Sequence, residues 1–563
     1  MHTTHWWCFV RAGLRAVVLL VCGLLFVVTA PALSIYQQFC ESRNALLHTP
    51  DASGFDGYAD RLQRSANREE RNSLFMGYHT ELEFPILLSS DLLREHMHVL
   101  GATGGGKSAL GMTPLITQLI RRDDGPVIVL DCKGDNSMFN TAKIEAERAG
   151  KTFKWFTNKP NRSTYIFNPF LQSSIGALTM QEVVGLFMLS LNLHHGDDYG
   201  RAWFSMASRR LFQAALNEFR KGRDSKRPLS FAELEEVLSY LSNNHEEFKA
   251  AQHLAFVIQG LSEFEQLNLS PNNNHPAVEH AIHMPEVIDK KQVVYFSLVA
   301  ATDLTSVAEI ARLAMYCALN AAMDYRERTG RRPNVYLVVD EAQNVVAKNI
   351  ENVLAQAREH GLACILCHQT MSQLNPPGGV DLRELVQNCT CIKLIFSTRD
   401  PHTKQYLSDI SGEVGYYDAT WTQFVPRVRQ GNVGKHVAVY YGDELPLCQV
   451  RQEIGPRLTA EDINDLSRHP NRCAISIERN EGYSINLGAF PVHMDWVMPK
   501  SEYERRNNDI PWPAGGDATI SIEPLWPQPN EETIVTEFHP LPDAREQPLD
   551  KLIELRKLLE GED

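Results

Sequence analysis

No excess of positive charge is present in this chain of 563 residues, which has 55 lysines and arginines against 69 aspartates and glutamates and a net charge of −14. A surface coated in basic residues for nucleic acid is therefore excluded, although a local basic channel is not. The hydrophobic content of 43% and the charged content of 22% are typical of a globular chain, not a disordered one. No internal repeat is evident, and the length corresponds to roughly three or four domains.

A clear metal-binding pattern of cysteines is also lacking. The eleven cysteines include two close pairs, Cys364 with Cys367 and Cys389 with Cys391, and both pairs lie in apolar, strand-like runs. Strand geometry would direct Cys364 and Cys367 to opposite faces, so the two would not share a zinc ion. We expect buried free thiols in a reducing compartment.

A long hydrophobic run occurs at the N-terminus. Residues 16–33 are uncharged and mainly apolar, and the run is just long enough to cross a hydrocarbon core as a helix. The competing interpretation is a signal peptide cleaved near Ala30-Pro31-Ala32. The preceding Arg11 and Arg15 suggest a cytoplasmic N-terminus. Arginines between residues 43 and 71 favour a cytoplasmic location for the segment after the apolar run, so the direction of insertion stays open.

A phosphate-binding loop is the strongest motif in the sequence. It matches GxxxxGK[ST] between a strand-like and a helix-like run, and such a loop turns backbone N–H groups toward a triphosphate. We expect Lys107 to reach the β- and γ-phosphates and the Ser108 hydroxyl to ligate Mg²⁺, so ATP and Mg²⁺ are the expected ligands. The loop residues are Gly101, Ala102, Thr103, Gly104, Gly105, Gly106, Lys107 and Ser108.

The acidic half of the site is predicted further along the chain. An apolar run ends in Asp340-Glu341, where a buried parallel strand would place side chains in the ligand crevice. We expect Asp340 to hold Mg²⁺ through water and Glu341 to polarise the attacking water. Another strand-like run, 363–367, precedes His368-Gln369, and Gln369 is placed to sense or orient the γ-phosphate.

These motifs decide between the two interpretations of the N-terminus. Cleavage of a signal peptide would leave a nucleotide-dependent domain outside the cell, away from ATP. We therefore predict a single-pass anchor in the inner (plasma) membrane with a cytoplasmic ATPase domain.

Alternation of strands and helices predicts an α/β fold with a parallel-rich sheet. Helical stripes replace this alternation in the middle of the chain, and we expect the stripe that begins with Trp203 and Phe204 to be core, not a base-stacking platform. The predicted division is an anchor at 1–36, a small lead-in domain at 37–95, a nucleotide-binding domain at 96–170 and 290–460, an all-α insertion domain at 171–289, and a C-terminal extension with a flexible acidic tail at 461–563.

The ordered set of motifs resembles the TraG/TraD-type coupling proteins of type IV secretion and conjugation, within the HerA/FtsK class of P-loop ATPases. The resemblance covers about residues 96–460. It is carried by the phosphate loop, Asp131-Cys132-Lys133-Gly134, Ile166-Phe167-Asn168-Pro169, residues 199–209, Asp340-Glu341, and Gln369 with Ser372-Gln373-Leu374.

The resemblance implies a RecA-like motor domain with an all-α domain, assembled as a homo-hexamer at the inner membrane. Such a ring passes single-stranded DNA, a relaxase–DNA complex or protein effectors to the type IV secretion channel proteins. It also implies an arginine acting on the neighbouring subunit's nucleotide, which is Arg358 in Arg358-Glu359-His360-Gly361; Arg399 is the alternative. Family members commonly have two membrane spans, and one is visible in this sequence.

Two other functions are compatible with the motifs. The first is a HerA/FtsK-like translocase of duplex DNA in segregation, packaging or repair. The second is a secretion receptor without motor activity, in which ATP only stabilises the ring. Basic clusters within 220–227, 326–332 and 427–435 are candidates for contact with a phosphate backbone.

Overall fold

The computed structural model describes residues 57–509 with internal gaps. Within these described residues no helix is both long and apolar enough to span a membrane. The predicted anchor at 1–36 and the predicted acidic tail lie outside the described residues. The gaps are residues 81, 123, 160–164, 194–200, 222–228, 245–248, 250, 269–280, 300–303, 348–349, 376–379, 422–447, 470 and 480–484.

An 11-stranded sheet forms the centre of the molecule, in the order β2-β1-β13-β12-β9-β3-β8-β7-β4-β6-β5. All neighbours from β9 to β5 are parallel, whereas β12, β13, β1 and β2 are added in antiparallel pairs. The predicted α/β fold with a parallel-rich sheet is confirmed. The strands are β1 (Ser73–His79), β2 (Pro85–Ser89), β3 (Met97–Leu100), β4 (Val127–Asp131), β5 (Phe153–Thr157), β6 (Val293–Ser297), β7 (Val335–Asp340), β8 (Leu362–His368), β9 (Ile392–Ile395), β12 (Arg472–Arg479) and β13 (Ile485–His493).

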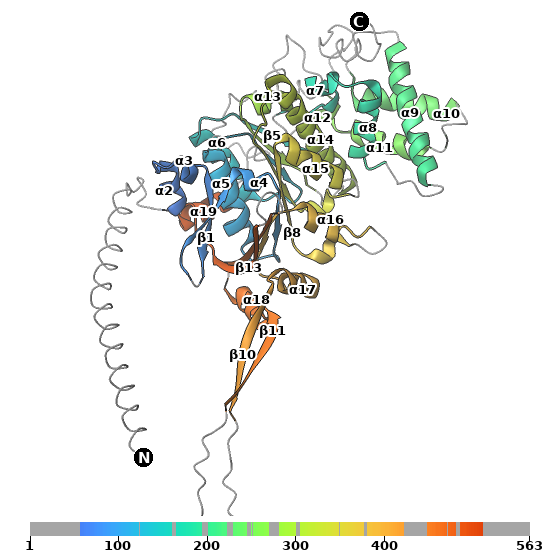
Figure 1. Cartoon of the computed structure of the whole chain (residues 1–563). Helices are drawn as coiled ribbons and strands as arrows, with labels where there is room; N and C mark the ends of the chain where they lie inside the picture. The colour runs from blue at the N-terminus through green and yellow to red at the C-terminus, as the bar shows by residue number, and fades with distance from the viewer. Residues whose placement is uncertain are drawn as a thin grey trace, which may run out of the picture.

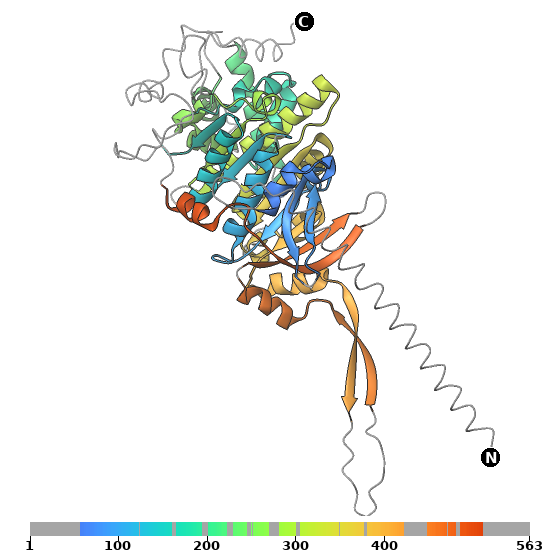
Figure 2. The ribbon, with the colours of Figure 1, turned by 90° about the vertical axis from the view of Figure 1, so that its left-hand side faces the viewer.

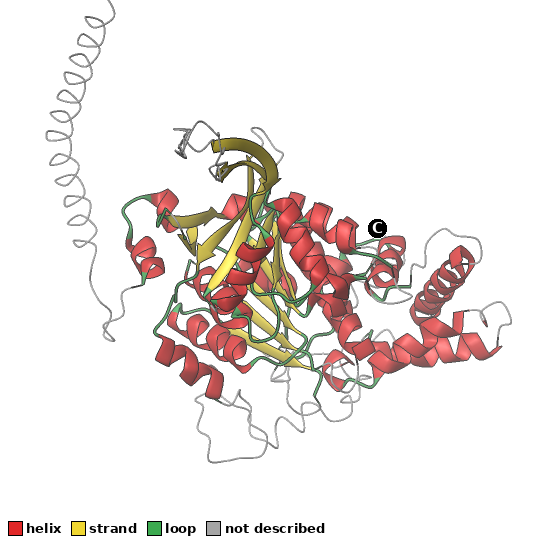
Figure 3. Cartoon of the chain, turned by 90° about the horizontal axis from the view of Figure 1, so that it is seen from below, coloured by secondary structure: helices red, strands yellow, loops and turns green. Residues whose placement is uncertain are grey.

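Helices cover both faces of this sheet (Figures 1 and 3). The helices around the sheet are α2 (Tyr58–Arg64), α3 (Arg68–Arg71), α4 (Ser90–Leu93), the π-helical η1 (Lys107–Met112), α5 (Thr113–Arg121), α6 (Asn136–Arg148), α14 (Leu304–Thr329), η5 (Ala342–Asn344), α15 (Ile350–His360), η6 (Met371–Leu374), α16 (Arg383–Cys389), α17 (Pro401–Ile410), α18 (Ala460–Arg468) and α19 (Lys500–Asn508).

The parallel strands are buried on both faces, which explains their continuous apolar runs. Every residue of β4, β7 and β8 is buried. Cys364 belongs to the apolar core on one side of the sheet and Cys367 to the core on the other side. The two side chains therefore lie on opposite faces, as the alternation of side chains along a strand predicts.

A group of helices lies between β5 and β6 in the chain and packs on the α14 side of the sheet. Its aromatic core includes Phe170 and Phe187, whose rings stack with centroids 4.4 Å apart. Thr179 and Glu182 form a capping box at the start of one helix. The group consists of η2 (Pro169–Leu171), α7 (Ser173–Gly176), α8 (Met180–Ser190), α9 (Arg201–Lys221), α10 (Phe231–Asn244), α11 (Gln252–Ser262), α12 (Glu265–Asn268) and α13 (Met284–Asp289).

The predicted core stripe on α9 is wrong at its first turn. Trp203 is 58% exposed and Phe204 is 48% exposed, whereas Leu211 and Phe212 further along the helix are buried. Helical spacing identifies residues that share a face. It does not determine how far along the helix the neighbouring elements reach.

Segments from both ends of the described chain complete the sheet. The predicted lead-in residues 37–95 include β1 and β2, and the predicted C-terminal extension includes β12 and β13. In the register, Tyr78 pairs with His493, and Ala474 pairs with Ile395. The first pairing joins the two ends of the described chain and the second joins the C-terminal strands to the parallel sheet, so neither end forms a sheet of its own.

A two-stranded ribbon, β10 (Glu413–Trp421) with β11 (Cys448–Pro456), projects away from the body between α17 and α18 (Figures 1 and 2). Its β10 strand begins three residues after the end of α17.

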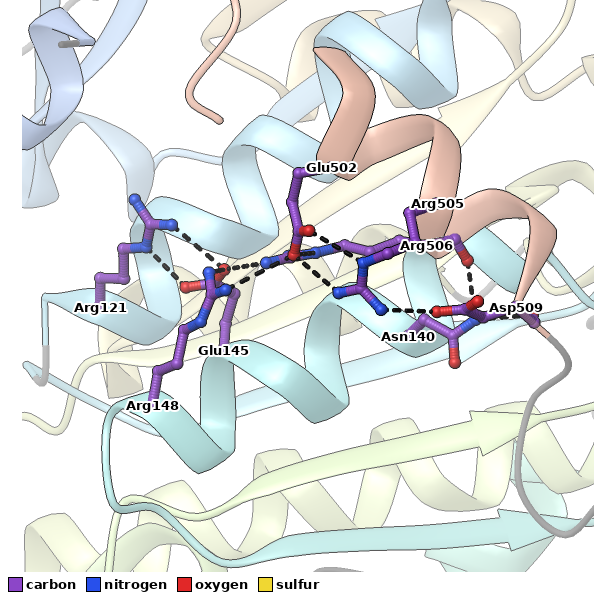
Figure 4. A network of polar contacts seen from close by, with 8 residues as sticks. All are labelled: Arg121, Asn140, Glu145, Arg148, Glu502, Arg505, Arg506 and Asp509. Carbon is purple, nitrogen blue, oxygen red and sulfur yellow. Dashed lines mark hydrogen bonds and ion pairs between the residues drawn. The ribbon is translucent and has the colours of Figure 1, made fainter. Parts of the chain in front are cut away.

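The last described helix, α19, is fixed on α6 by a buried network of ion pairs (Figure 4). The side chain of Arg506 is fully buried; its Nη2 lies 2.8 Å from Glu145 Oε1 and its Nε lies 2.9 Å from Glu502 Oε1. Arg121 Nε approaches the other oxygen of Glu145 at 2.6 Å. Asn140 donates hydrogen bonds to the backbone carbonyls of Arg506 and Asp509. The network ties the end of the described chain to α5 and α6.

Candidate nucleotide site

The carboxyl ends of four adjacent parallel strands meet at one edge of the sheet. The phosphate loop follows β3, Gln369 follows β8, Asp340 ends β7, and Asp131 ends β4. Asp340 and Asp131 are directly paired in the register, and Leu100 pairs with His368. Ligands bind at this edge in open α/β sheets, so the sequence motifs are brought together where nucleotide chemistry is expected.

The phosphate loop has the backbone geometry that its glycines permit. Gly106 has a φ of 87°, a left-handed conformation that glycine adopts without strain, and η1 begins at the next residue. Two neighbouring strand ends hold the start of the loop. Gly101 N–H donates to the His368 carbonyl at 3.3 Å, and Ala102 N–H donates to the Ser397 carbonyl at 2.9 Å.

Lys107 and Asp340 are both buried at the base of this loop. Burial raises the pKa of Asp340 to about 6, and the positive charge of Lys107 offsets part of that rise. Asp340 Oδ1 has no hydrogen-bond partner among the described residues. A buried carboxylate oxygen of this kind, with the Ser108 hydroxyl on η1, fits Mg²⁺ held partly through water.

Glu341 follows β7 in a left-handed backbone conformation with a φ of 52°. Its carboxylate accepts hydrogen bonds from Gln343 Nε2 at 2.7 Å and from Gln369 Nε2 at 3.1 Å. Burial alone would raise the pKa of Glu341, but these hydrogen bonds and the nearby lysines hold it below its ordinary value. The group is therefore ionised at neutral pH, as a general base must be.

Gln369 connects the two halves of the site. Its side-chain oxygen accepts a hydrogen bond from Thr103 Oγ1 in the phosphate loop at 3.1 Å, while its Nε2 donates to Glu341. The same amide thus contacts both the loop and the acidic strand end, which is where a γ-phosphate sensor is expected.

A pair of histidines under the loop was not predicted from the sequence. The Nε2 atoms of His98 and His368 lie 2.6 Å apart, and the rings stack with centroids 4.7 Å apart. His368 Nδ1 faces the Thr370 carbonyl at 3.0 Å, so it carries the proton and Nε2 of His368 accepts from His98. Burial lowers the pKa of both, that of His368 to about 4. In the sequence, the one indication of this neutral pair is that each histidine belongs to an apolar, strand-like run.

The two candidate arginines lie near opposite ends of the parallel strands, Arg358 near the amino ends and Arg399 near the carboxyl ends. Arg358 is at the end of α15, near the amino ends of β3 and β8, where its Nη2 lies 3.6 Å from Glu95 Oε1. It is not brought to the phosphate loop of its own chain. Arg399 is exposed and follows β9, two residues after Ser397, whose carbonyl binds the loop.

The basic cluster at 326–332 is partly neutralised. Arg326 pairs with Glu359 at 3.0 Å, and Arg328 pairs with Asp324 at 2.7 Å. The clusters at 220–227 and 427–435 lie outside the side chains that the structure describes.

Two family models match the chain. The model described as the central domain of the helicase HerA matches residues 74–309. The model described as the TraM recognition site of TraD and TraG matches residues 334–436. No curated protein matches the sequence significantly.

The solved structures that match the chain have low sequence identity. The unbound bacterial conjugative coupling protein TrwBdeltaN70 is 15% identical, over 77% of this chain and 91% of that chain, with a TM-score of 0.49. The plasmid coupling protein TrwB in complex with ADP and Mg²⁺ is 15% identical, over 77% and 92%, with a TM-score of 0.49. VirB4 of Thermoanaerobacter pseudethanolicus is 14% identical, over 76% and 97%, with a TM-score of 0.44. The two family-model matches bear out the resemblance of the chain to the TraG/TraD-type coupling proteins of the HerA/FtsK class of P-loop ATPases.

Proposed function

We propose that the chain is an ATP hydrolase with a RecA-like motor domain, which drives transfer of a DNA or nucleoprotein substrate into a type IV secretion or conjugation channel. The observation that carries this proposal is the link from Thr103 through Gln369 to Glu341. It joins the phosphate loop to an ionised carboxylate, and binding alone would not need such a carboxylate.

Each site residue has a role in this proposal. The loop N–H groups of Gly101–Gly106 and the ammonium of Lys107 bind the β- and γ-phosphates of ATP. Ser108 and Asp340 would hold Mg²⁺, which would neutralise charge on the phosphate oxygens. Glu341 accepts a proton from the attacking water, and Gln369 orients that water and the γ-phosphate.

We further propose a homo-hexameric ring tethered to the inner membrane through residues 1–36. Support for the ring comes from Arg358, which lies at the sheet edge remote from its own phosphate loop and would serve a neighbour's site. Support for a relaxosome and channel partner comes from the matched TraM recognition model. The expected cargo is single-stranded DNA or a relaxase–DNA complex, with protein effectors as a further possibility.

The test uses the full-length protein in detergent and in cells. We expect Glu341→Gln to bind ATP but to lose about 10²-fold or more in kcat, because the general base is removed. Lys107→Ala should lose nucleotide binding, and both variants should abolish transfer in cells. Glu461→Gln, an exposed glutamate on α18, is the matched control. Transfer that survives in both site variants would favour the receptor without motor activity.

The match to the HerA central domain also favours a second candidate, a translocase of duplex DNA. DNA stimulation of the ATPase separates the two. We expect single-stranded DNA to stimulate hydrolysis and the stimulation to weaken as salt rises. Stimulation by duplex DNA alone, together with full function after deletion of residues 1–36, would support the duplex translocase instead.

A further inference from the structure

The turn that follows β4 is built around one buried carboxylate, which the proposed mechanism does not use. Asp131 Oδ1 accepts hydrogen bonds from the backbone N–H groups of Lys133 and Gly134, at 2.9 and 2.8 Å. Its Oδ2 accepts from Asp135 N–H at 2.8 Å and from the Tyr295 hydroxyl at 2.7 Å. Asp131 is fully buried. With four donors on its two oxygens, this carboxylate is committed to shaping the turn.

This turn flanks the acidic strand end on the side opposite to Gln369. The strand order β8-β7-β4 puts β7, which carries Asp340 and Glu341, between β8 and β4. Asp131 pairs directly with Asp340 in the register. The helix that starts after the turn, α6, also contacts η1 of the phosphate loop. The turn therefore lies next to both the loop helix and the general base.

Lys133 is the exposed cation that this turn presents. Among the described residues it makes no ion pair, and its positive charge acts on Glu341 together with that of Lys107. The neighbouring acids Asp131 and Asp340 are buried, whereas Lys133 is exposed. An ammonium on a long stem is suited to meet a phosphate that arrives with the ligand.

We propose that Lys133 is a second phosphate-binding lysine, whose ammonium contacts the terminal phosphate of the nucleotide held by the loop at residues 101–108. Asp131 is a positioning residue, because it fixes the backbone that carries Lys133. The inference rests on the proposed ATPase function. It specifies that the site distinguishes a triphosphate from a diphosphate through the turn after β4.

Nucleotide affinity of the full-length protein tests this proposal. We expect Lys133→Met to bind a non-hydrolysable ATP analogue about tenfold more weakly, the scale of one charged hydrogen bond. Affinity for ADP should be unchanged, because ADP lacks the terminal phosphate. Lys133→Arg should restore most of the affinity. Lys290→Met is the matched control, since this exposed lysine pairs with Glu286 at the end of α13.

Two results would overturn the inference while leaving the ATPase proposal intact. One is an equal loss of affinity for the analogue and for ADP, which indicates a general disturbance of the site. The other is unchanged nucleotide affinity with weaker DNA binding, which assigns Lys133 to the cargo. If the wild-type protein binds neither nucleotide, the proposed function fails and the inference fails with it.

Discussion

Gln369 is the residue whose contacts make the sharpest kinetic prediction. Its amide touches the Thr103 hydroxyl and the Glu341 carboxylate, and neither of these is a backbone N–H or the lysine assigned to phosphate binding. We expect Gln369→Ala to lower kcat by about 10²-fold with little change in ATP affinity, because water orientation is lost and phosphate binding is kept. Thr103→Val removes one hydroxyl contact and should have a much smaller effect. A rise in KM with unchanged kcat would contradict the assigned role.

Buried neutral histidines predict that the fold weakens in acid. His96 Nε2 donates to the Leu354 carbonyl, and His96 Nδ1 accepts from Cys364 N–H, so a second proton would face a donor. Burial lowers the pKa of His96 from 6.5 to about 4. Between these values the unfolded chain binds the proton, so stability is complete above about pH 6.5 and falls as the pH drops toward 4.

The denaturant midpoint measures this loss. From pH 7 to pH 5, His96 alone should lower the free energy of unfolding by about 2 kcal/mol. His96→Asn should reduce the slope, because asparagine tolerates the φ of 65° at this position. His402→Asn changes an exposed histidine and should leave the slope as it is. An identical pH dependence in the His96 variant would contradict the prediction.

At the scale of elements, α19 depends on one buried arginine (Figure 4). Burial alone would raise the pKa of Glu145, but Arg121 and Arg506 hold it below its ordinary value. Arg506→Ala should therefore destabilise the protein by about 3–5 kcal/mol, because a buried carboxylate loses a partner. Its neighbour Arg505 is 53% exposed, so water screens its ion pairs with Glu502 and Asp509, and Arg505→Ala should cost less than about 1 kcal/mol. Urea midpoints of the two variants make the comparison, and equal midpoints would contradict it.

At the scale of the whole molecule, the proposed ring requires either Arg358 or Arg399 to complete a neighbour's site. Arg358 lies near the amino ends of the parallel strands, and the phosphate loop lies at their carboxyl ends. Arg399 follows β9 beside that loop. We expect Arg358→Ala and Lys107→Ala proteins to be inactive alone but active when mixed. A competent interface then takes the loop from one variant and the arginine from the other, so about one quarter of the sites should work.

Mixing Arg399→Ala with Lys107→Ala is the control for this experiment. If Arg399 acts within its own chain, a neighbouring subunit cannot replace it. The mixture should then be no more active than the two variants are separately. Complementation by Arg399→Ala and none by Arg358→Ala would transfer the role to Arg399.

Features that depend on residues close together in the sequence could be predicted, and features that depend on distant residues could not. The phosphate loop, Asp340-Glu341 and Gln369 depend on local strand ends, so the short apolar runs before them sufficed for their prediction. The antiparallel side of the sheet was harder to predict, because β1 pairs with β13 across most of the chain and neither these strands nor β12 carry a local mark of their partners. The exposure of Trp203 and the pairing of His98 with His368 likewise depend on which elements lie next to them.

By itself, the sequence determined the nucleotide chemistry of this protein, because glycine flexibility, a lysine and carboxylates after buried strands are properties of short segments. Only the tertiary structure decided how those segments cooperate. In the tertiary structure Gln369 lies between Thr103 and Glu341, and the turn that carries Lys133 lies beside the Glu341 carboxylate. Arg358 lies near the amino ends of the parallel strands, away from its own phosphate loop. Strand order depends on the apolar surface that the whole sheet buries, and a single segment of the sequence does not reveal which strands will be its neighbours.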